Sequence, residues 1–205
     1  ILWLHNTLSI EKALRKKKLY LIFKHKINAV FVSKYLQNIT TNLFFFNKQK
    51  VIRNFLSNKF KTNKINFKRK PIIVWSVQRD KGLNETIDMW INKINNKNKK
   101  IKFYIFGIKK NFFKKKIDYY KKYNIFFYGR VPKERLFKIY NKSIAMICLG
   151  YDETFCLNAL EANACGLPIL TFGKTALKDF SVNNYNNFIL NNFDELSKKI
   201  ISISN

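Results

Sequence analysis

The stretch Tyr151–Thr171, YDETFCLNALEANACGLPILT, predicts a loop, a helix and a strand in quick succession. Residues 157–165 have the spacing of a helix and stop at Gly166-Leu167-Pro168, where a glycine closely followed by a proline is a helix C-terminal signal. The short apolar run Pro168–Thr171 is typical of a buried strand. This stretch therefore predicts one helix-and-strand unit of an α/β fold.

Two acidic residues accompany the start of this helix. Glu153 lies in the loop before it, and Glu161, eight positions later, is predicted about two turns into it. A helix N-terminus offers unpaired backbone N–H groups and the positive end of a dipole, and both suit a phosphate group. The two acids with a phosphate cradle between them predict a site for a sugar nucleotide. The alternative is a surface Glu153 followed by a core helix with one capping glutamate.

Residues 153–168, ETFCLNALEANACGLP, resemble the E-x7-E signature of the retaining GT-B glycosyltransferases of family 4, the glycosyl transferases group 1. The usual form is close to E-x-F-G-x-x-x-x-E-A-x-A-x-G-x-P. The chain departs from it at Cys156, where the family usually has glycine. The matching positions are Glu153, Phe155, Glu161, Ala162, Ala164, Gly166 and Pro168.

From Pro71 onward, short apolar strands alternate with helices. Continuous apolar strands in such an alternation predict a Rossmann-like parallel sheet with helices on both faces, as the GT-B resemblance also implies. Ligands of such sheets bind outside the carboxyl ends of the strands. The predicted strands are residues 72–76, 101–106, 125–128, 144–149, 168–171 and 188–190, and the predicted helices are residues 83–94, 110–122, 132–140, 157–165 and one from 194.

Residues 1–61 resemble the C-terminal part of the family's N-terminal, acceptor-side domain, which is a second Rossmann-like domain. The predicted strands are residues 1–4, 28–32 and 51–56, with a helix from Ser9 to about Lys24 and another that Ser33 caps. Residues 62–70 are interpreted as the linker and residues 71–205 as the nucleotide-sugar-binding domain. Because the chain opens on an apolar strand without Met, we expect a fragment that holds a complete or near-complete donor-binding domain and is inactive alone.

The charge of the chain is extreme, with 40 Lys and Arg against 12 Asp and Glu and a formal net charge of +28. Basic surfaces bind nucleic acid or anionic membranes. The lysines are scattered over the whole chain together with many Asn, Phe and Ile, so we interpret most of the charge as compositional drift. The basic segment Glu11–Lys26 is either a solvated helix face or a peripheral contact with anionic lipid.

No apolar run approaches the roughly 20 residues that span a bilayer. The cysteines Cys148, Cys156 and Cys165 lie in apolar surroundings, as near-core residues of a reducing compartment do. No His/Cys cluster has the spacing of a metal site. We therefore expect a cytoplasmic location, with the inner face of the cell membrane as an option for peripheral contact.

The loop after the first strand of the C-terminal domain carries a pair of cations. Arg79, Lys81 and Gly82 resemble the family's Arg…Lys-Gly segment, although Arg79 and Lys81 are only two positions apart and the family's pair is more widely spaced. The resemblance implies that both cations hold the donor diphosphate. Fixed cations stabilise the charge that a leaving nucleoside diphosphate gains, without a metal.

The resemblance also implies roles for other positions. Glu161 should hold the ribose hydroxyls, Glu153 the donor sugar, and His5 should lie near the anomeric carbon. Main-chain groups at Gly129 and Val131 should contact the base. Amides of Phe155, Cys156, Leu157 and Asn158 should face the diphosphate.

The implied activity is transfer of a sugar from a nucleotide-sugar donor to a glycan or lipid-linked acceptor, with retention of configuration. The pathway would be glycan, lipopolysaccharide or glycolipid synthesis, with no cofactor and no metal. Two alternatives remain at this point: a basic nucleic-acid-binding protein, which the charge suggests, and a non-catalytic GT-B scaffold subunit, which Cys156 and the short cation loop suggest.

Overall fold

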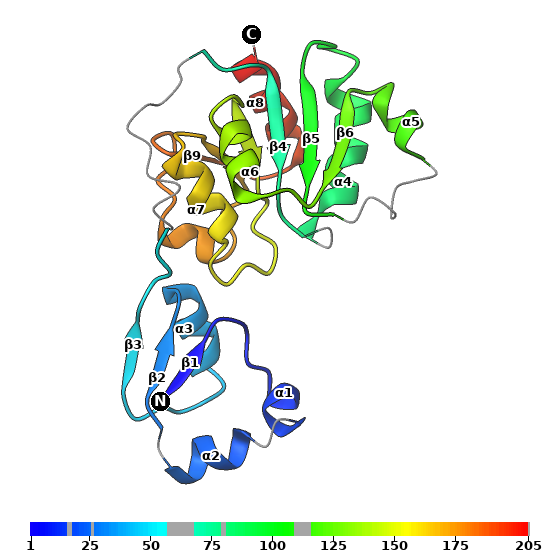
Figure 1. Ribbon diagram of the computed structural model, residues 1–205. Helices are drawn as coiled ribbons and strands as arrows, with labels where there is room; N and C mark the ends of the chain where they lie inside the picture. The colour runs from blue at the N-terminus through cyan, green and yellow to red at the C-terminus, as the bar shows by residue number, and fades with distance from the viewer. Residues whose placement is uncertain (16–17, 26, 57–67, 79–80, 109–115, 205) are drawn as a thin grey trace. The chain divides into compact units, whose positions relative to one another are not determined.

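The computed structural model describes residues 1–15, 18–25, 27–56, 68–78, 81–108 and 116–204, which form two compact units (Figure 1). The first unit comprises residues 1–55, 152–156 and 174–180, and the second comprises residues 56–151, 157–173 and 181–205. The predicted linker boundaries at residues 61 and 70 stay predictions, because residues 57–67 lie outside the described residues.

The first unit contains a parallel sheet of β1 (Leu2–Leu4), β2 (Ala29–Phe31) and β3 (Gln49–Val51), in that order. Its helices are α1 (Ile10–Arg15), α2 (Lys18–His25) and α3 (Lys34–Thr41), together with a 3-10 turn, η6, over Ala176–Asp179. The prediction of one helix from Ser9 to Lys24 was wrong, since α1 and α2 are separate elements. The prediction that Ser33 caps a helix is confirmed, because its hydroxyl accepts a hydrogen bond from the Leu36 amide at 3.0 Å.

The third strand of this sheet lies earlier in the chain than predicted. β3 ends at Val51, whereas the apolar pattern placed the strand at residues 51–56. Pairing explains the difference, because β2 offers only three residues and its last, Phe31, pairs with Val51. The exposed polar residues Gln49 and Lys50 lie in the strand because a partner is available there, and not because their own pattern favours it.

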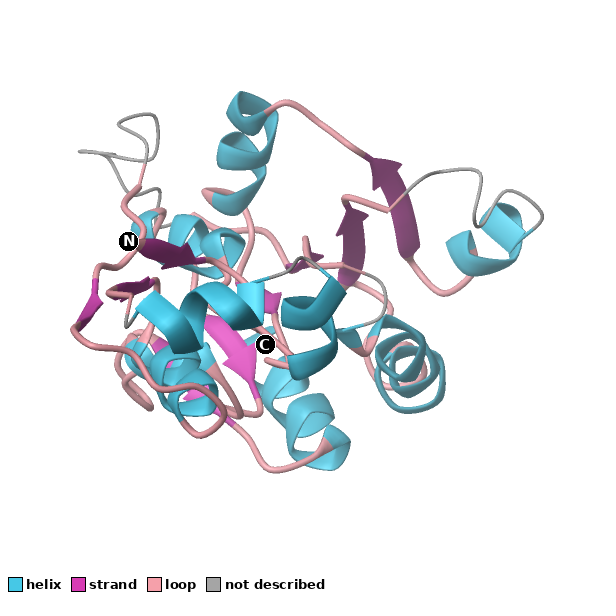
Figure 2. Ribbon diagram, turned by 90° about the horizontal axis from the view of Figure 1, so that it is seen from below, coloured by secondary structure: helices cyan, strands magenta, loops and turns pink. Residues whose placement is uncertain are grey.

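The second unit is built on six parallel strands in the order β6-β5-β4-β7-β8-β9. The sheet therefore grows outward from its first strand in one direction and then reverses, which is the topology of a doubly wound dinucleotide-binding fold. Figure 2 separates these strands from the surrounding helices by colour. The strands are β4 (Ile72–Trp75), β5 (Lys102–Phe106), β6 (Ile125–Gly129), β7 (Ala145–Ile147), β8 (Ile169–Thr171) and β9 (Asn187–Ile189).

Helices cover both faces of this sheet, as the sequence predicts. In Figure 1, α6 (Lys133–Tyr140) and α7 (Leu157–Ala164) lie in front of the central strands, and α4 (Leu83–Met89) and α8 (Phe193–Ser204) lie behind them. The short α5 (Ile117–Lys121) precedes β6. β4, β7 and β8 are buried throughout, which is why all of their residues except Thr171 are apolar. Among the described residues, none of the helices has the length and apolar character needed to cross a membrane.

The helix predicted over residues 83–94 changes its geometry before its end. α4 stops at Met89, and Trp90–Ile94 form a π-helical turn, η3. Trp90 is fully buried, stacks on Phe103 of β5 with ring centroids 4.7 Å apart, and donates its indole N–H to the Tyr123 carbonyl oxygen at 3.0 Å. The π-helical turn therefore begins at the residue that packs on this face of the sheet. Hydrophobic periodicity predicts a helix here but does not distinguish π-helical from α-helical geometry.

Arg69, two residues before Pro71, joins the C-terminal ends of α6 and α7. Its guanidinium donates to the carbonyl oxygens of Tyr140 at 2.9 Å, Ser143 at 2.7 Å and Cys165 at 2.9 Å. Burial lowers the pKa of Arg69, and the same burial raises the pKa of the Cys165 thiol to about 11. A cation at two helix C-termini satisfies carbonyls that have no partner within the helix.

Replacement of Arg69 by Met should therefore destabilise the second unit. The change takes a charged donor away from three carbonyl oxygens, of which that of Tyr140 keeps the 3.3 Å bond from the Ser143 amide. A hydrogen bond from a charged group contributes about 1.5–3 kcal/mol. We expect the free energy of unfolding in urea to fall by about 2–4 kcal/mol, with a smaller loss in Arg69→Lys. The matched control is Lys122→Met, an exposed cation beyond α5. Equal stability of Arg69→Met and this control would show that Arg69 does not join the helices.

Candidate functional site

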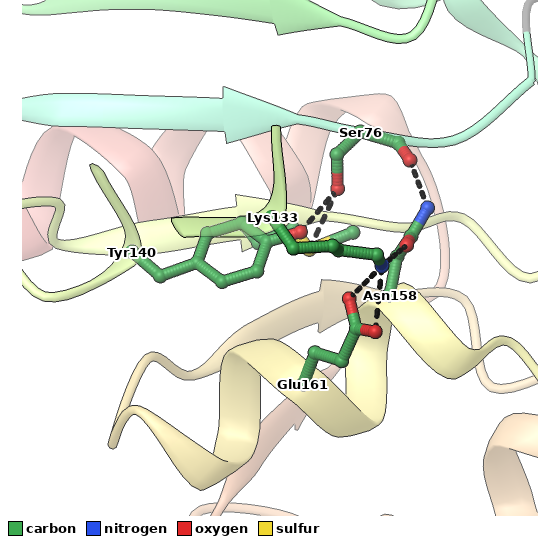
Figure 3. Close-up of polar contacts among 6 residues, drawn as sticks. Ser76, Lys133, Tyr140, Asn158 and Glu161 are labelled. Carbon is green, nitrogen blue, oxygen red and sulfur yellow. Dashed lines mark hydrogen bonds and ion pairs between the residues drawn. The ribbon is translucent and has the colours of Figure 1, made fainter. Parts of the chain in front are cut away.

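The strand order of the second unit reverses between β4 and β7, and the carboxyl ends of these strands form the edge at which such sheets bind ligands. The side-chain amide of Asn158, the second residue of α7, donates to the carbonyl oxygen of Ser76, which follows β4 (Figure 3). The Ser76 and Tyr140 hydroxyl oxygens lie 2.6 Å apart. The start of α7 is thereby held directly at this edge.

Glu161 presents a buried carboxylate beside Asn158. Lys133, the first residue of α6, places its Nζ atom 2.6 Å and 2.5 Å from the two carboxylate oxygens of Glu161 and 3.4 Å from Asn158 Oδ1 (Figure 3). The Glu161 side chain is 10% exposed and that of Lys133 is 49% exposed. Glu161 is the fifth residue of α7, so the predicted two turns into the helix were wrong, and one turn is correct.

The ion pair gives this carboxylate a fixed direction. A lone buried carboxylate is costly, and a partner that stays half exposed supplies the opposite charge while losing only part of its own hydration. Sequence reasoning missed Lys133. The available signal was its position directly after Val131-Pro132, at the start of a helix that follows a strand and therefore begins at the carboxyl edge.

Gly82 lies between Lys81 and α4, with φ at 97°. A Cβ atom at this position would lie 2.7 Å from Leu149 Cδ1 and 2.8 Å from Tyr151 Cε2, so only glycine fits both the backbone and the space. Lys81 is half-buried at the same turn, and Arg79 lies outside the described residues. The structure thus places Lys81 and Gly82 just after the carboxyl end of β4, as the sequence predicted.

Gly129 and Val131 follow the neighbouring edge of the sheet. Gly129 is the last residue of β6, one residue beyond the predicted end, because it pairs with Phe106 across an irregularity in the register. It is buried, with φ at 70°, and its carbonyl oxygen accepts a hydrogen bond from the Gly107 amide at 2.8 Å. Val131 is half-buried in the loop that leads to Lys133.

The remaining predicted residues apart from Leu157 belong to the first unit, in which residues 152–156 pack with the N-terminal segment. The Thr154 hydroxyl donates to the His5 carbonyl oxygen at 2.7 Å, so the structure brings His5 to the loop that carries Glu153. The His5 ring is stacked on Trp3. Glu153 is half-buried, and its carbonyl oxygen accepts a hydrogen bond from the Ala176 amide at 3.2 Å.

Phe155 and Cys156 complete this loop. Phe155 is buried, with its ring 6.1 Å from that of Phe180. Cys156 has φ at 60°, which is the left-handed region that favours glycine. The glycine of the resembling signature therefore has a backbone reason, and Cys156 keeps the conformation at the cost of some strain. Leu157, exposed at the start of α7, belongs to the second unit.

Solved structures share this fold at low sequence identity. S. aureus TarM in complex with fondaparinux, alpha-GlcNAc-glycerol and UDP has a TM-score of 0.77 and 19% identity over 98% of this chain and 42% of its own. Anabaena HepE with UDP and glucose has a TM-score of 0.73, 14% identity and coverage of 98% and 60%. Sucrose-phosphate synthase from Thermosynechococcus elongatus has a TM-score of 0.74, 15% identity and coverage of 98% and 57%.

These likenesses confirm the predicted α/β fold of GT-B type. The chain spans about 42–60% of the length of the three solved chains. No curated protein matches it. Residues 55–205 match the family model described as glycosyl transferases group 1, which covers most of the sequence and the whole neighbourhood of α7. The chain therefore belongs to the glycosyl transferases group 1 family.

Proposed function

We propose that this chain carries the donor site of a retaining family 4 glycosyltransferase, which transfers a sugar from a nucleotide sugar to a glycan or lipid-linked acceptor. One observation carries the proposal: the buried Glu161 carboxylate, held at the carboxyl edge where the strand order reverses, stands at the second acidic position of the E-x7-E spacing. The parallel sheet and family membership support the sugar-nucleotide class of ligand.

The ribose is the proposed partner of Glu161. An ionised carboxylate has about four lone-pair sites, so each oxygen can accept from Lys133 and still accept from a ribose hydroxyl. Lys133 then acts as a positioning residue, because its ammonium group contacts both carboxylate oxygens and fixes their direction. The free site is pre-organised for a vicinal diol.

The diphosphate is assigned to Lys81, with Arg79 and the amides around Phe155–Asn158 as further donors. Fixed cations and amides stabilise the leaving diphosphate electrostatically, so we propose that the reaction needs no metal. Glu153 and His5 are assigned to the donor sugar near the reacting carbon. In the proposed step the bond from the sugar to the diphosphate breaks as the acceptor oxygen attacks from the same face, and the leaving phosphate oxygen takes the acceptor proton.

The ligands in the neighbouring structures suggest probes. TarM was solved with UDP and HepE with UDP and glucose, so uridine nucleotides are the first donors to test. The acceptor class is proposed from the same source, since the TarM complex contains alpha-GlcNAc-glycerol. A cytoplasmic site of action at the inner face of the membrane is the location that we propose.

Lys81→Ala tests the diphosphate assignment by calorimetric titration of this chain with UDP and with uridine. The wild-type chain should bind both, and the variant should lose about ten-fold in UDP affinity, which is about 1.4 kcal/mol, with no change for uridine. Lys97→Ala, an exposed lysine beyond η3, is the matched control. Equal losses for UDP and uridine would move Lys81 away from the diphosphate, and no binding of any nucleotide would contradict the donor site.

The two glutamates should fail in different ways in the full-length protein. The ribose does not react, so Glu161→Gln should raise KM and leave kcat nearly unchanged. The sugar held by Glu153 develops positive charge, so Glu153→Gln should lower kcat by one to three orders of magnitude, or roughly 1.4–4 kcal/mol. The measurement is steady-state kinetics with donor varied. A reversed pattern would exchange the two roles, and donor binding without turnover in the wild type would favour the scaffold alternative.

The ion pair itself is tested by Lys133→Met. Removing the cation leaves a buried carboxylate alone, which costs 3–5 kcal/mol for a fully buried pair and should cost about 1–3 kcal/mol here because Lys133 is half in water. Urea unfolding checks the loss. The double variant Lys133→Met with Glu161→Gln should recover part of it, and Lys138→Met, exposed on the same helix, should be neutral. Additive losses in the double variant would deny the coupling.

A further inference from the structure

A pocket lies at the edge of the second unit's sheet that is opposite the candidate donor site. Its volume is about 440 Å³, and its lining comes from the amino ends of β4 and β5 and the C-terminal end of α6. Ile72 and Lys102 are the first residues of β4 and β5 and pair in register, so this pocket and the Ser76–Glu161 site lie at opposite ends of the strands. The lining residues are Lys70, Pro71, Ile72, Lys100, Lys102, Tyr104, Ile139 and Lys142.

The floor of the pocket is apolar. Ile72 is buried at 8% exposure, and Tyr104 and Ile139 are half-buried. Lys102 and Tyr104 alternate along β5 and therefore lie on the same face of the sheet as Ile72, the partner of Lys102. This is the face toward α6, because Ser76, which continues the same alternation along β4, contacts Tyr140 of that helix.

The rim of the pocket is positive. Four of the eight lining residues are lysines and none of the eight is acidic, and all four lysines are exposed. The C-terminal end of α6 would bring negative carbonyl dipoles to the same place, but Arg69 donates to two of these carbonyls, those of Tyr140 and Ser143. Several cations around an apolar, low-dielectric floor concentrate a positive electrostatic potential there, and this potential attracts anions.

We infer that this pocket binds an organic phosphate, whose phosphate group lies among the lysines and whose apolar body covers Ile72, Tyr104 and Ile139. A phosphate ion alone would leave this floor wet, and the volume is that of sites that hold small organic ligands. The inference does not depend on the proposed transferase activity, since none of the donor-site residues lines this pocket. The phosphate could belong to a soluble metabolite or to a lipid headgroup.

The probe is 2-naphthyl phosphate, which joins one phosphate group to an apolar ring, titrated into the whole chain by calorimetry. The control ligands are inorganic phosphate, which lacks the apolar ring, and 2-naphthol, which lacks the phosphate group. We expect 2-naphthyl phosphate to bind at least ten-fold more tightly than either. The double variant Lys100→Gln with Lys102→Gln should lose at least ten-fold in affinity, and Lys97→Gln with Lys122→Gln, which removes the same charge from exposed sites outside the lining, less than two-fold.

Thermal unfolding of both double variants checks that they fold, and Lys142→Gln, a single change on the α6 side, gives a second measure of the same pocket. A flotation assay with phosphatidic acid and phosphatidylcholine vesicles separates the two sources. If the protein floats with the vesicles and only the pocket variants lose this association, the ligand is a lipid headgroup. If the protein binds naphthyl phosphate but does not associate with the vesicles, the ligand is soluble. Equal losses in the pocket and control variants, or no loss in either, would overturn the inference.

Discussion

The hydrogen bond from the Asn158 side chain to the Ser76 carbonyl oxygen connects helix α7 to the ligand-binding edge of the sheet. Ser76 follows the first strand of a sheet whose order reverses beside it, and Asn158 is the second residue of the helix that carries Glu161. This contact holds the start of α7 at the edge, while Arg69 holds its C-terminal end through the Cys165 carbonyl oxygen. The position of the Glu161 carboxylate beside Lys133 therefore depends on how the helix is attached at both ends.

Much of the second unit could be predicted from sequence because its strands are buried on both faces. β4 and β7 consist of apolar residues throughout, β8 departs from this only at Thr171, and the glycine and proline after α7 end that helix as expected. β3 was placed wrongly for the opposite reason. Its residues Gln49 and Lys50 are exposed, so their place in a strand depends on the partner β2 and leaves no mark on the local pattern.

The residues of the candidate site likewise divide into those that the sequence predicts and those that it does not. Glu161, Gly82 and Gly129 stand where a motif or a backbone requirement fixes the residue type, and the structure places all three at the carboxyl edge. Lys133 was harder to find, because in a chain with 40 Lys and Arg its residue type carries no information and its position after a strand is the available signal. The 2.5–2.6 Å contacts with Glu161 then assign its role. The positive φ of Cys156 likewise appears only in the backbone, and it explains why a glycine is expected there.

The three cysteines differ in a way that makes the chain convenient for spectroscopy. Cys148 and Cys165 are buried, and burial raises the pKa of Cys165 to about 11, so its thiolate is scarce at neutral pH. Cys156 is less buried than the other two and lies in the loop that carries Glu153. A thiol-directed fluorophore or spin label should therefore attach preferentially at Cys156 without replacement of the other two cysteines. Such a label would report on the loop without any change to the sequence.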